Sequence, residues 1–159
     1  MIIRPAHPDD APAICDISNA LIQHSLITFT TDLRSEVETR RAIDRADGAF
    51  LVAEEDGRVV GFASFGPFRG GPGYVHTKEH SIQLAPEARG RGVGKKLMSQ
   101  LEGIAMAQDV HVLVAGISSA NPAGVAFHKS FGFVEAGRMP EVGRKSDQWL
   151  DLILMQKIL

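Results

Sequence analysis

A glycine-rich turn that carries basic residues lies between a predicted strand and a predicted helix. Arg89–Gly94 has the sequence RGRGVG, with three glycines in six residues. Glycine lets a ligand approach the backbone closely, and the free N–H groups at the start of a helix attract anions. A strand, a glycine-rich turn and a helix in this order are typical of phosphate-binding sites. The sequence therefore predicts an anion site at this turn.

Two common phosphate-binding motifs do not fit the turn. A P-loop requires G-x-x-x-x-G-K followed by Ser or Thr, but Arg89 takes the first glycine position and Lys96 takes the place of the hydroxyl. The dinucleotide fingerprint G-x-G-x-x-G fails because Lys95 or Leu97 stands where the third glycine is needed. The pattern that remains is R-x-x-G-x-G, beginning at Arg89.

Length and composition limit the classes of protein to which this chain can belong. The 159 residues are 44% hydrophobic and 23% charged, so we expect residues 1–159 to form a single globular domain. A net charge of −2 offers no broad attraction to nucleic acid or to an anionic membrane, and neither partner is expected. The single Cys15 excludes an intrachain disulfide and lies in an apolar helical pattern, which favours a buried thiol over a nucleophile. No apolar run reaches the ~20 residues of a membrane span, and no signal-peptide core is found, so a soluble, cytoplasmic protein is expected.

The pattern of apolar and turn-forming residues predicts a mixed α/β protein. A capping-box sequence at Ser35 and a hairpin turn at Asp56-Gly57 predict helices followed by an antiparallel hairpin. The second half alternates strand and helix, which predicts a helical crossover. Gly66–Gly73 holds four glycines and two prolines and is expected to be an irregular active-site loop, while the charged segment Arg138–Asp147 is not assigned to an element. The predicted strands are 1–4, 50–55, 58–65, 74–84, 110–117 and 149–158, and the predicted helices begin near Pro8, Ser35, Gly92 and Asn121.

Two motifs together resemble the GNAT acyltransferases. That family carries Q/R-x-x-G-x-G/A before a helix and, after its fifth strand, N-x-x-A followed by Tyr and then G-F. Here Asn121, Gly124, His128 and Gly132-Phe133 stand at the matching offsets of the second motif. Within the family, the chain is similar over essentially its whole length to the phosphinothricin and methionine sulfoximine (methionine sulfone) N-acetyltransferases. The segments that carry this likeness are Phe29-Thr30-Thr31, Gly66-Pro67-Phe68, Tyr74–Ser81 and Trp149-Leu150-Asp151.

The resemblance implies a fold, a reaction and a cofactor. We expect a GNAT-like α/β domain, with a central mixed sheet flanked by helices, that transfers the acetyl group of acetyl-CoA to a small-molecule amine and forms a homodimer. Backbone amides of Gly92–Leu97 are expected to hold the pyrophosphate, and Leu84–Pro86 the pantetheine arm. The backbone N–H of Leu84 is expected to polarise the thioester carbonyl. The cofactor-binding residues so implied are Leu84, Ala85, Pro86, Arg91, Gly92, Val93, Gly94, Lys95, Lys96, Leu97 and Asn121.

Two side chains are candidates for proton transfer. Glu79 aligns with the carboxylate that these relatives use as a general base, and its place beside a glycine-rich loop favours partial desolvation. The alternative for Glu79 is a solvated strand glutamate. His128 stands where most GNATs have the tyrosine that protonates the leaving sulfur. Imidazole titrates near neutrality and suits that role, but a packed helix histidine is the alternative.

The resemblance also implies an amino-acid-like substrate, of the methionine sulfone, methionine sulfoximine or phosphinothricin type, acetylated on its α-amine. Several relatives have arginine where Val75 stands, so a neutral sulfone or sulfoximine is expected to be preferred over anionic phosphinothricin. The expected substrate-binding residues are Phe29, Val75, His76 and Thr77, and the side chains that could replace the missing arginine are Arg69, His76, Lys78 and Arg144.

Other functions remain open at this point. The nearest is a GNAT that acetylates a polyamine, an aminoglycoside or a protein amine, although Asp32 is the only acid in the segments 29–32 and 66–78. A non-catalytic acyl-CoA-binding module is a second alternative, and the presence of Glu79 argues against it. A metal site at His76, Glu79 and His80 is not expected, because residue 79 of a strand points away from residues 76 and 80.

Overall fold

One mixed sheet of seven strands runs through the computed structural model, which describes all of residues 1–159. The strand order is β1-β2-β3-β4-β5-β7-β6, and β4 and β5 are the only parallel neighbours. The predicted α/β class and the helical crossover, β4–α3–β5, are therefore confirmed. The strands are β1 (Ile2–Pro5), β2 (Phe50–Glu55), β3 (Arg58–Pro67), β4 (Thr77–Leu84), β5 (Val112–Ser118), β6 (Val134–Lys145) and β7 (Gln148–Ile158).

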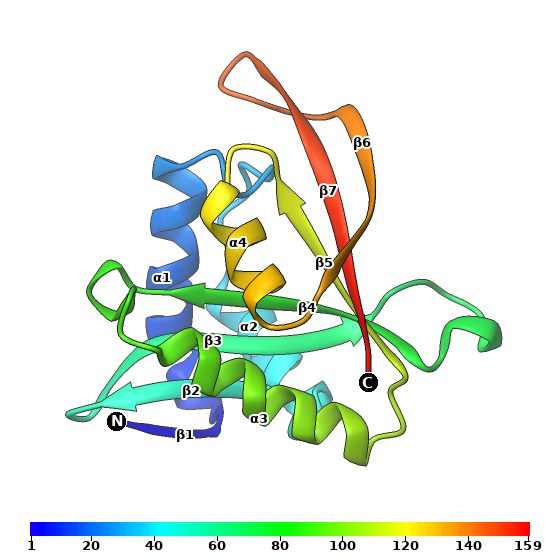
Figure 1. The fold of residues 1–159 in the computed structure, drawn as a ribbon. Coiled ribbons are helices and arrows are strands. Elements are labelled where there is room, and N and C mark those ends of the chain that lie inside the picture. The colour runs from blue at the N-terminus through cyan, green and yellow to red at the C-terminus, as the bar shows by residue number, and fades with distance from the viewer.

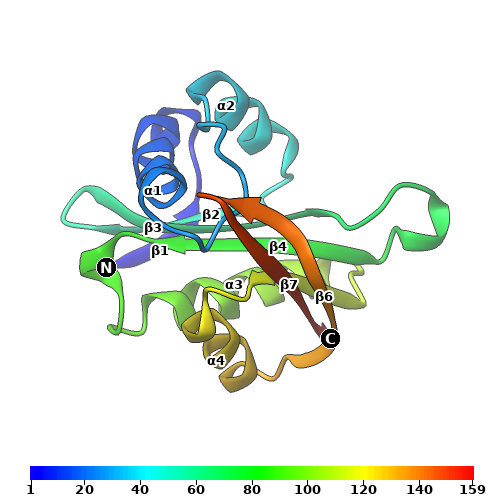
Figure 2. The same ribbon diagram turned by 90° about the horizontal axis from the view of Figure 1, so that it is seen from above.

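Four α-helices cover the two faces of this sheet. Figure 2 shows α1 and α2 on one face and α3 and α4 on the other. The predicted cap of α2 is confirmed, because the Ser35 side chain accepts a hydrogen bond from the N–H of Glu38. The helices are α1 (Ala11–His24), α2 (Glu36–Arg45), α3 (Val93–Ala107) and α4 (Pro122–Ser130), and none is long and apolar enough to cross a membrane.

The hydrophobic core has one layer on each face of the sheet. The larger layer packs α3 against the strands and includes Leu97 and Leu101, both fully buried. The smaller layer lies under α1 and α2 around Ile14, Val52 and Phe62. Burial of each such side chain contributes about 1.5–3 kcal/mol, so both layers fix the helices onto the sheet. Cys15 is buried and free, as predicted.

The sheet opens in its middle, between β4 and β5. These strands pair over only three positions, from Thr77 with Val112 to Glu79 with Val114. Beyond that point β4 continues beside β3 and β5 continues beside β7. Figure 1 shows β1–β4 lying across the molecule while β5–β7 run upward from the same region. A wedge-shaped opening therefore begins directly after Glu79.

One segment that the sequence left unassigned forms a strand, and two predicted boundaries are wrong. The charged segment Arg138–Asp147 belongs mostly to β6, whose exposed edge position removes the alternation of apolar residues that marks a strand. The loop predicted at Gly66–Gly73 is shorter, since Gly66 and Pro67 still pair with β4. Strand β4 also begins at Thr77 rather than Tyr74, because Pro72–Tyr74 forms a 3₁₀ turn.

Candidate active site

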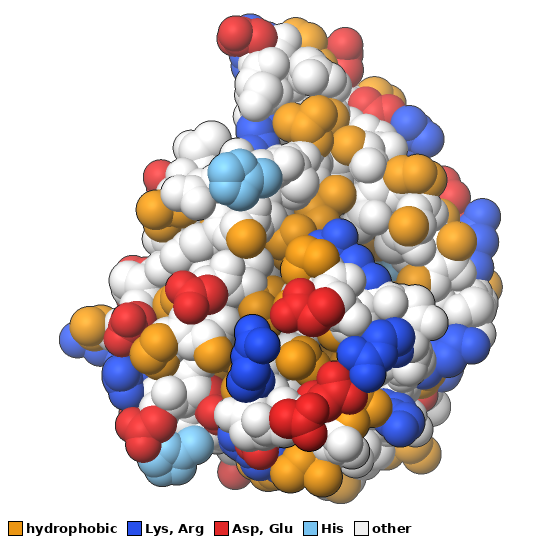
Figure 3. Space-filling model, turned by 90° about the vertical axis from the view of Figure 1, so that its left-hand side faces the viewer, with side chains coloured by type: hydrophobic (Ala, Val, Ile, Leu, Met, Phe, Trp, Pro, Cys, Tyr) orange, Lys and Arg blue, Asp and Glu red, His pale blue; other side chains and the backbone are white.

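A cavity of about 620 Å³ lies in the opening between β4 and β5. Residues 80–84 of β4 line one side and residues 115–118 of β5 line the other. The turn 89–90, part of α4 and the segment 27–29 that follows α1 complete the wall. On the face drawn in Figure 3, apolar side chains lie at the bottom of a central hollow, with Lys and Arg side chains beside it. Acidic side chains lie beside the hollow as well, so the charges around it are mixed.

The start of α3 presents backbone to this cavity. Gly92 caps the helix in the left-handed conformation (φ 80°), and the first hydrogen bond of this turn is donated by Lys96 to the Gly92 carbonyl. Earlier N–H groups of α3 are therefore free to bind an anion. A Cβ on Gly94 would stand 3.2 Å from the Phe127 ring and 3.6 Å from Leu84 Cδ1, so a side chain there would enter the space where a ligand meets the helix. This geometry fits a pyrophosphate held by backbone amides.

Three of the expected cofactor-binding residues line the cavity: Leu84, Gly94 and Asn121. Asn121 also starts α4, because its side-chain oxygen accepts from the N–H of Gly124 at 2.9 Å. Arg89 of the R-x-x-G-x-G motif lines the cavity too and is the one Lys or Arg side chain among the lining residues. The cationic charge inside the cavity therefore lies at the α3 end.

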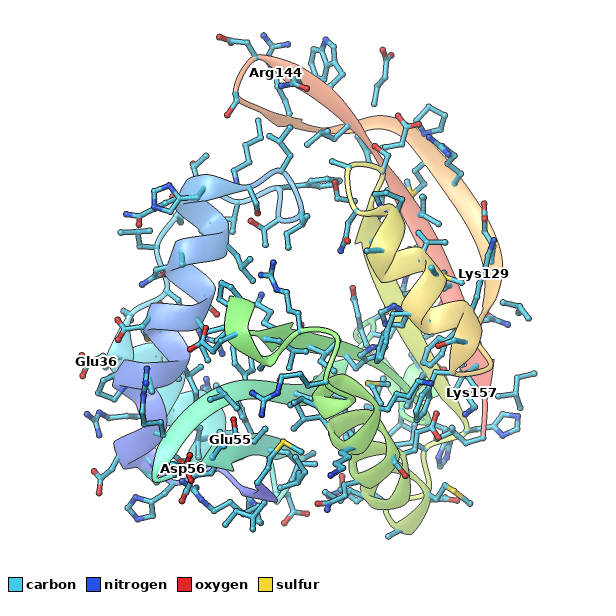
Figure 4. All side chains as sticks on the ribbon, turned by 60° about the vertical axis from the view of Figure 1, so that its left-hand side comes forward. Glu36, Glu55, Asp56, Lys129, Arg144 and Lys157 are labelled. Carbon is cyan, nitrogen blue, oxygen red and sulfur yellow. The ribbon has the colours of Figure 1, made fainter.

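The other expected cofactor-binding residues do not line the cavity. Ala85, Val93 and Leu97 have side chains buried in the core, so only their backbone groups could face a ligand. Arg91 forms an ion pair with Glu55, with nitrogen and oxygen 2.7 Å apart; Figure 4 labels Glu55 at the end of β2. The remaining four, all exposed, are Pro86, Gly92, Lys95 and Lys96.

Glu79 lies where β4 and β5 separate. It forms the last pair with β5, and its Oε1 is 3.1 Å from the point where a Cβ on Gly116 would stand. Gly116 lines the cavity, which places the carboxylate at the rim of the opening. No Lys, Arg or His forms an ion pair with Glu79, and the side chain is exposed rather than desolvated by the protein. The carboxylate is therefore unpaired and accessible.

His128 contacts a second histidine, His80, which the sequence analysis weighed only as a metal ligand. The Nε2 atoms of His80 and His128 are 2.9 Å apart, and His128 Nδ1 lies 2.7 Å from the Gly124 carbonyl oxygen. That carbonyl can only accept, so Nδ1 of His128 carries the proton and its Nε2 accepts from Nε2–H of His80. His80 Nδ1 is then a buried acceptor without a donor. Both ring nitrogens of His128 are engaged within the protein.

Burial keeps the histidine pair uncharged. Burial, with a further contribution from the nearby His128, lowers the pKa of His80 to about 3. Burial also lowers the pKa of His128. At neutral pH, therefore, two neutral rings form one wall of the cavity, packed against Phe127 and Phe133.

Of the expected substrate-binding residues, Phe29 lines the cavity and Val75, His76 and Thr77 do not. Val75 is 55% exposed, and the His76 ring bonds to the Asp109 carbonyl oxygen at 2.7 Å. These three residues precede the opening, because the cavity lining on β4 begins at His80, beyond the last pair with β5.

The side chains considered as substitutes for the missing arginine also lie outside the cavity lining. Arg69 stacks on Phe68 at 5.3 Å, and Arg144 stacks on Trp149 at 4.5 Å. Thr28, beside Phe29, does line the cavity, and no motif or spacing in the sequence pointed to it.

Comparison with known proteins adds independent information. The model of the acetyltransferase (GNAT) family matches residues 19–133. The chain is 41% identical to the L-amino acid N-acyltransferase MnaT of Escherichia coli, over 98% of this chain and 92% of that protein. It is 40% identical to the L-methionine sulfoximine/L-methionine sulfone acetyltransferase of Salmonella typhimurium, over 98% and 93%. It is 31% identical to the phosphinothricin N-acetyltransferase of Streptomyces coelicolor, over 99% and 95%.

Solved structures agree with this result. An acetyltransferase from Salmonella typhimurium, determined with its cofactor acetyl-CoA, superimposes with a TM-score of 0.95 at 38% identity, covering 100% of this chain and 94% of that one. A phosphinothricin acetyltransferase from Sinorhizobium meliloti in complex with acetyl-CoA gives a TM-score of 0.93 at 33% identity, covering 99% and 88%. The fold and the cofactor of these proteins match the arrangement described above.

Proposed function

The chain belongs to the GNAT family of acetyl-CoA-dependent N-acetyltransferases, and we propose that it acetylates the α-amine of a small amino-acid-like substrate of the methionine sulfone, methionine sulfoximine or phosphinothricin type. One observation carries the proposal for the amine: the unpaired carboxylate of Glu79 lies at the rim of the cavity, where the sheet opens. The names of the relatives support the proposal that the substrate is amino-acid-like.

The residues present fit acetyl-CoA. The free N–H groups of α3 and the close backbone at Gly94 suit its pyrophosphate, with Arg89 adding positive charge beside them. The backbone of Leu84, at the end of β4, suits the pantetheine arm and the thioester carbonyl. Acetyl-CoA supplies the activated acetyl group when it is bound.

Glu79 acts as the general base in this proposal. An amino-acid ammonium must lose a proton before its nitrogen can attack a thioester carbon. The carboxylate of Glu79 has no ion-pair partner, so its oxygens are free to accept that proton. Binding of the substrate at the rim would also remove water from the carboxylate, which is otherwise exposed.

In this proposal, His128 shapes the cavity wall and does not transfer a proton. A proton donated from His128 to the departing sulfur would require breaking its bond to the Gly124 carbonyl, since its other nitrogen accepts from His80. Burial also lowers the pKa of His128, so a cationic donor form is disfavoured. We therefore assign His128 to the shape and neutrality of the cavity wall, and water can supply the proton to sulfur.

A homodimer and a cytoplasmic location are also part of the proposal. Strand β6 is an edge of the sheet, and exposed apolar side chains gather on β6 and β7: Val134, Met139, Val142, Trp149 and Ile158. Light scattering should give a molar mass twice that of the chain, and Val142→Glu should reduce this mass to that of a single chain. An unmodified chain that is monomeric at high concentration would contradict the dimer. The single free cysteine is in keeping with a reducing compartment.

An acetyl-CoA consumption screen tests the substrate class. The amines should include amino acids, their sulfone, sulfoximine and phosphinate analogues, spermidine and a peptide. We expect turnover with methionine sulfone or methionine sulfoximine and little with spermidine or the peptide. Turnover confined to polyamines or peptides would overturn the proposed substrate, and tight CoA binding without any turnover would indicate a non-catalytic module.

A further inference from the structure

Lys145 is a buried cation without a counter-ion. The residue is only 6% exposed, and no carboxylate lies within ion-pair distance of its ammonium group. Its Nζ instead donates to two atoms of Thr28, the carbonyl oxygen at 2.9 Å and Oγ1 at 3.1 Å. Burial lowers the pKa of Lys145, as expected of an ammonium that lacks a neighbouring anion. An ammonium buried without a counter-ion is costly, and an anion bound nearby would lower that cost.

The contact with Lys145 decides how the Thr28 hydroxyl is oriented. An ammonium group has donors only, so Oγ1 of Thr28 must accept from it. The hydroxyl proton then points elsewhere, and no acceptor of the protein receives it. Because Oγ1 already accepts from a cation, its O–H bond is polarised and becomes a stronger donor.

Thr28 lies in the wall of the cavity, next to Phe29. Figure 4 labels Arg144, the neighbour of Lys145, at the end of the β6–β7 hairpin, above the segment that follows α1. The hairpin thus brings a positive charge close to the cavity without exposing it to water. Among the lining side chains the only cation is Arg89, at the α3 end, so the Phe29 end has no charged group of its own.

We propose that the hydroxyl group of Thr28, oriented and polarised by Lys145, donates a hydrogen bond to the carboxylate of the amino-acid substrate. The inference rests on the proposed function and deepens it by assigning the group that recognises the substrate's acidic end. Lys145 is a positioning residue, since it acts through Thr28. The substrate carboxylate, bound beside Thr28, would also supply the counter-ion that the buried ammonium of Lys145 lacks.

If Thr28 and Lys145 had only a structural role, the kinetic effect of changing them would be different. The segment after α1 is held by other contacts, among them a hydrogen bond from Ser118 Oγ to the Leu26 carbonyl at 2.7 Å and close packing of Phe29 on Gly143. Loss of the Thr28 hydroxyl should therefore leave the segment in place. If the hydroxyl only supported the loop, its removal would affect every amine substrate equally.

The experiment compares two amines that differ in one group. Methionine sulfone carries the carboxylate, and 3-(methylsulfonyl)propan-1-amine is the same molecule without it. We expect Thr28→Val, which keeps the shape of the side chain, to lower kcat/KM for methionine sulfone about 10- to 100-fold, mainly through KM, as for loss of a hydrogen bond to a charged group. The same variant should leave kcat/KM for the carboxylate-free amine and the KM for acetyl-CoA unchanged.

Two further variants complete the test. Thr28→Ser should restore kcat/KM for methionine sulfone, and Lys145→Met should lower it while sparing the carboxylate-free amine. Equal losses on both amines, or no loss with Thr28→Val, would overturn the inference while the proposed function stands. A wild-type protein that turns over neither amine would overturn the proposed function, and the inference with it.

Discussion

The imidazole rings of His80 and His128 are joined by a hydrogen bond between their Nε2 atoms, 2.9 Å apart. The first ring belongs to β4, one residue beyond the last pair with β5, and the second belongs to α4. The bond therefore joins α4 to β4 beside the narrow end of the opening. Because neither ring is charged at neutral pH, it does so without placing a cation in the wall of the cavity.

This pair makes stability depend on pH. An unfolded histidine with a pKa near 6.5 binds a proton as the pH falls, whereas folded His80, with a pKa of about 3, does not. The unfolded state then binds more protons, so the free energy of unfolding decreases between pH 6.5 and about 3 and is unaffected above pH 6.5. From pH 8 to pH 5, His80 alone should lower it by about 2 kcal/mol.

The variant His80→Phe isolates this effect. At pH 8 it should be less stable than the wild type by about 1–3 kcal/mol, since His128 loses a hydrogen bond and keeps a buried, unpaired nitrogen. The difference should shrink by about 2 kcal/mol at pH 5, because the variant has no His80 to protonate on unfolding. Urea denaturation at both pH values measures it, and a constant difference would show that His80 is not the responsible group.

Glu79→Gln should lower kcat by about 10²- to 10⁴-fold, the range for removal of a general base. The amide keeps the size of the side chain but cannot accept the proton of an ammonium. The loss should shrink at high pH, where the substrate amine is already neutral. Glu135→Gln, a matched change at an exposed position of β6, should leave kcat unaltered. Near-normal turnover of Glu79→Gln at neutral pH would make Glu79 a solvated strand residue.

Gly94→Ala should weaken acetyl-CoA binding without loss of stability. The added methyl would stand 3.2 Å from the Phe127 ring, at the place where backbone meets the cavity. Gly103→Ala is the control in the same helix, because Gly103 is exposed and a Cβ there has open space. Both changes raise helix propensity by up to about 1 kcal/mol, so thermal stability controls for folding. If calorimetry gave Gly94→Ala and Gly103→Ala the same affinity for acetyl-CoA, the proposed role of the α3 turn would be wrong.

Local signals explain which parts of this structure the sequence could predict. The Asp56-Gly57 turn, the Ser35 cap and the glycines before α3 act on neighbouring residues, and each predicted element is present. Strand β6 carries no such signal, because an exposed edge strand needs no apolar alternation.

The missed functional contacts are long-range. Lys145 and Thr28 are 117 residues apart in sequence, and His80 and His128 are 48 apart. Neither residue type nor spacing shows that these side chains meet, since their contact depends on how β6 and α4 pack. The expected substrate residues Val75, His76 and Thr77 were assigned from resemblance, and they precede the opening, whose lining on β4 begins at His80.

Gly143→Ala should impair substrate binding through Phe29. A Cβ at Gly143 would lie 2.6 Å from the Phe29 ring, so the ring must move. We expect about 1–3 kcal/mol of lost stability from overpacking and on the order of a tenfold loss in kcat/KM for the amine, with unchanged acetyl-CoA affinity. Gly137→Ala, on the same strand with open space around its Cβ, is the control. Unchanged amine kinetics for Gly143→Ala would remove Phe29 from the substrate pocket.

The last prediction concerns the choice among substrates. Near the Phe29 end, the cavity offers the Thr28 hydroxyl but no cationic side chain of its own, and Arg69 and Arg144 stack on aromatic rings outside the lining. One polarised donor suits a single carboxylate, whereas the phosphinate of phosphinothricin brings a second negative charge that nothing in the cavity wall at this end neutralises. Burying an unpaired charge costs more than burying a neutral sulfone or sulfoximine, so methionine sulfone and methionine sulfoximine should have the higher kcat/KM. Ranking kcat/KM for the three compounds at one pH measures this, and added salt should change the ranking little because the difference arises inside the cavity. A preference for phosphinothricin would mean that another cation, from this chain or from a partner subunit, reaches the phosphinate.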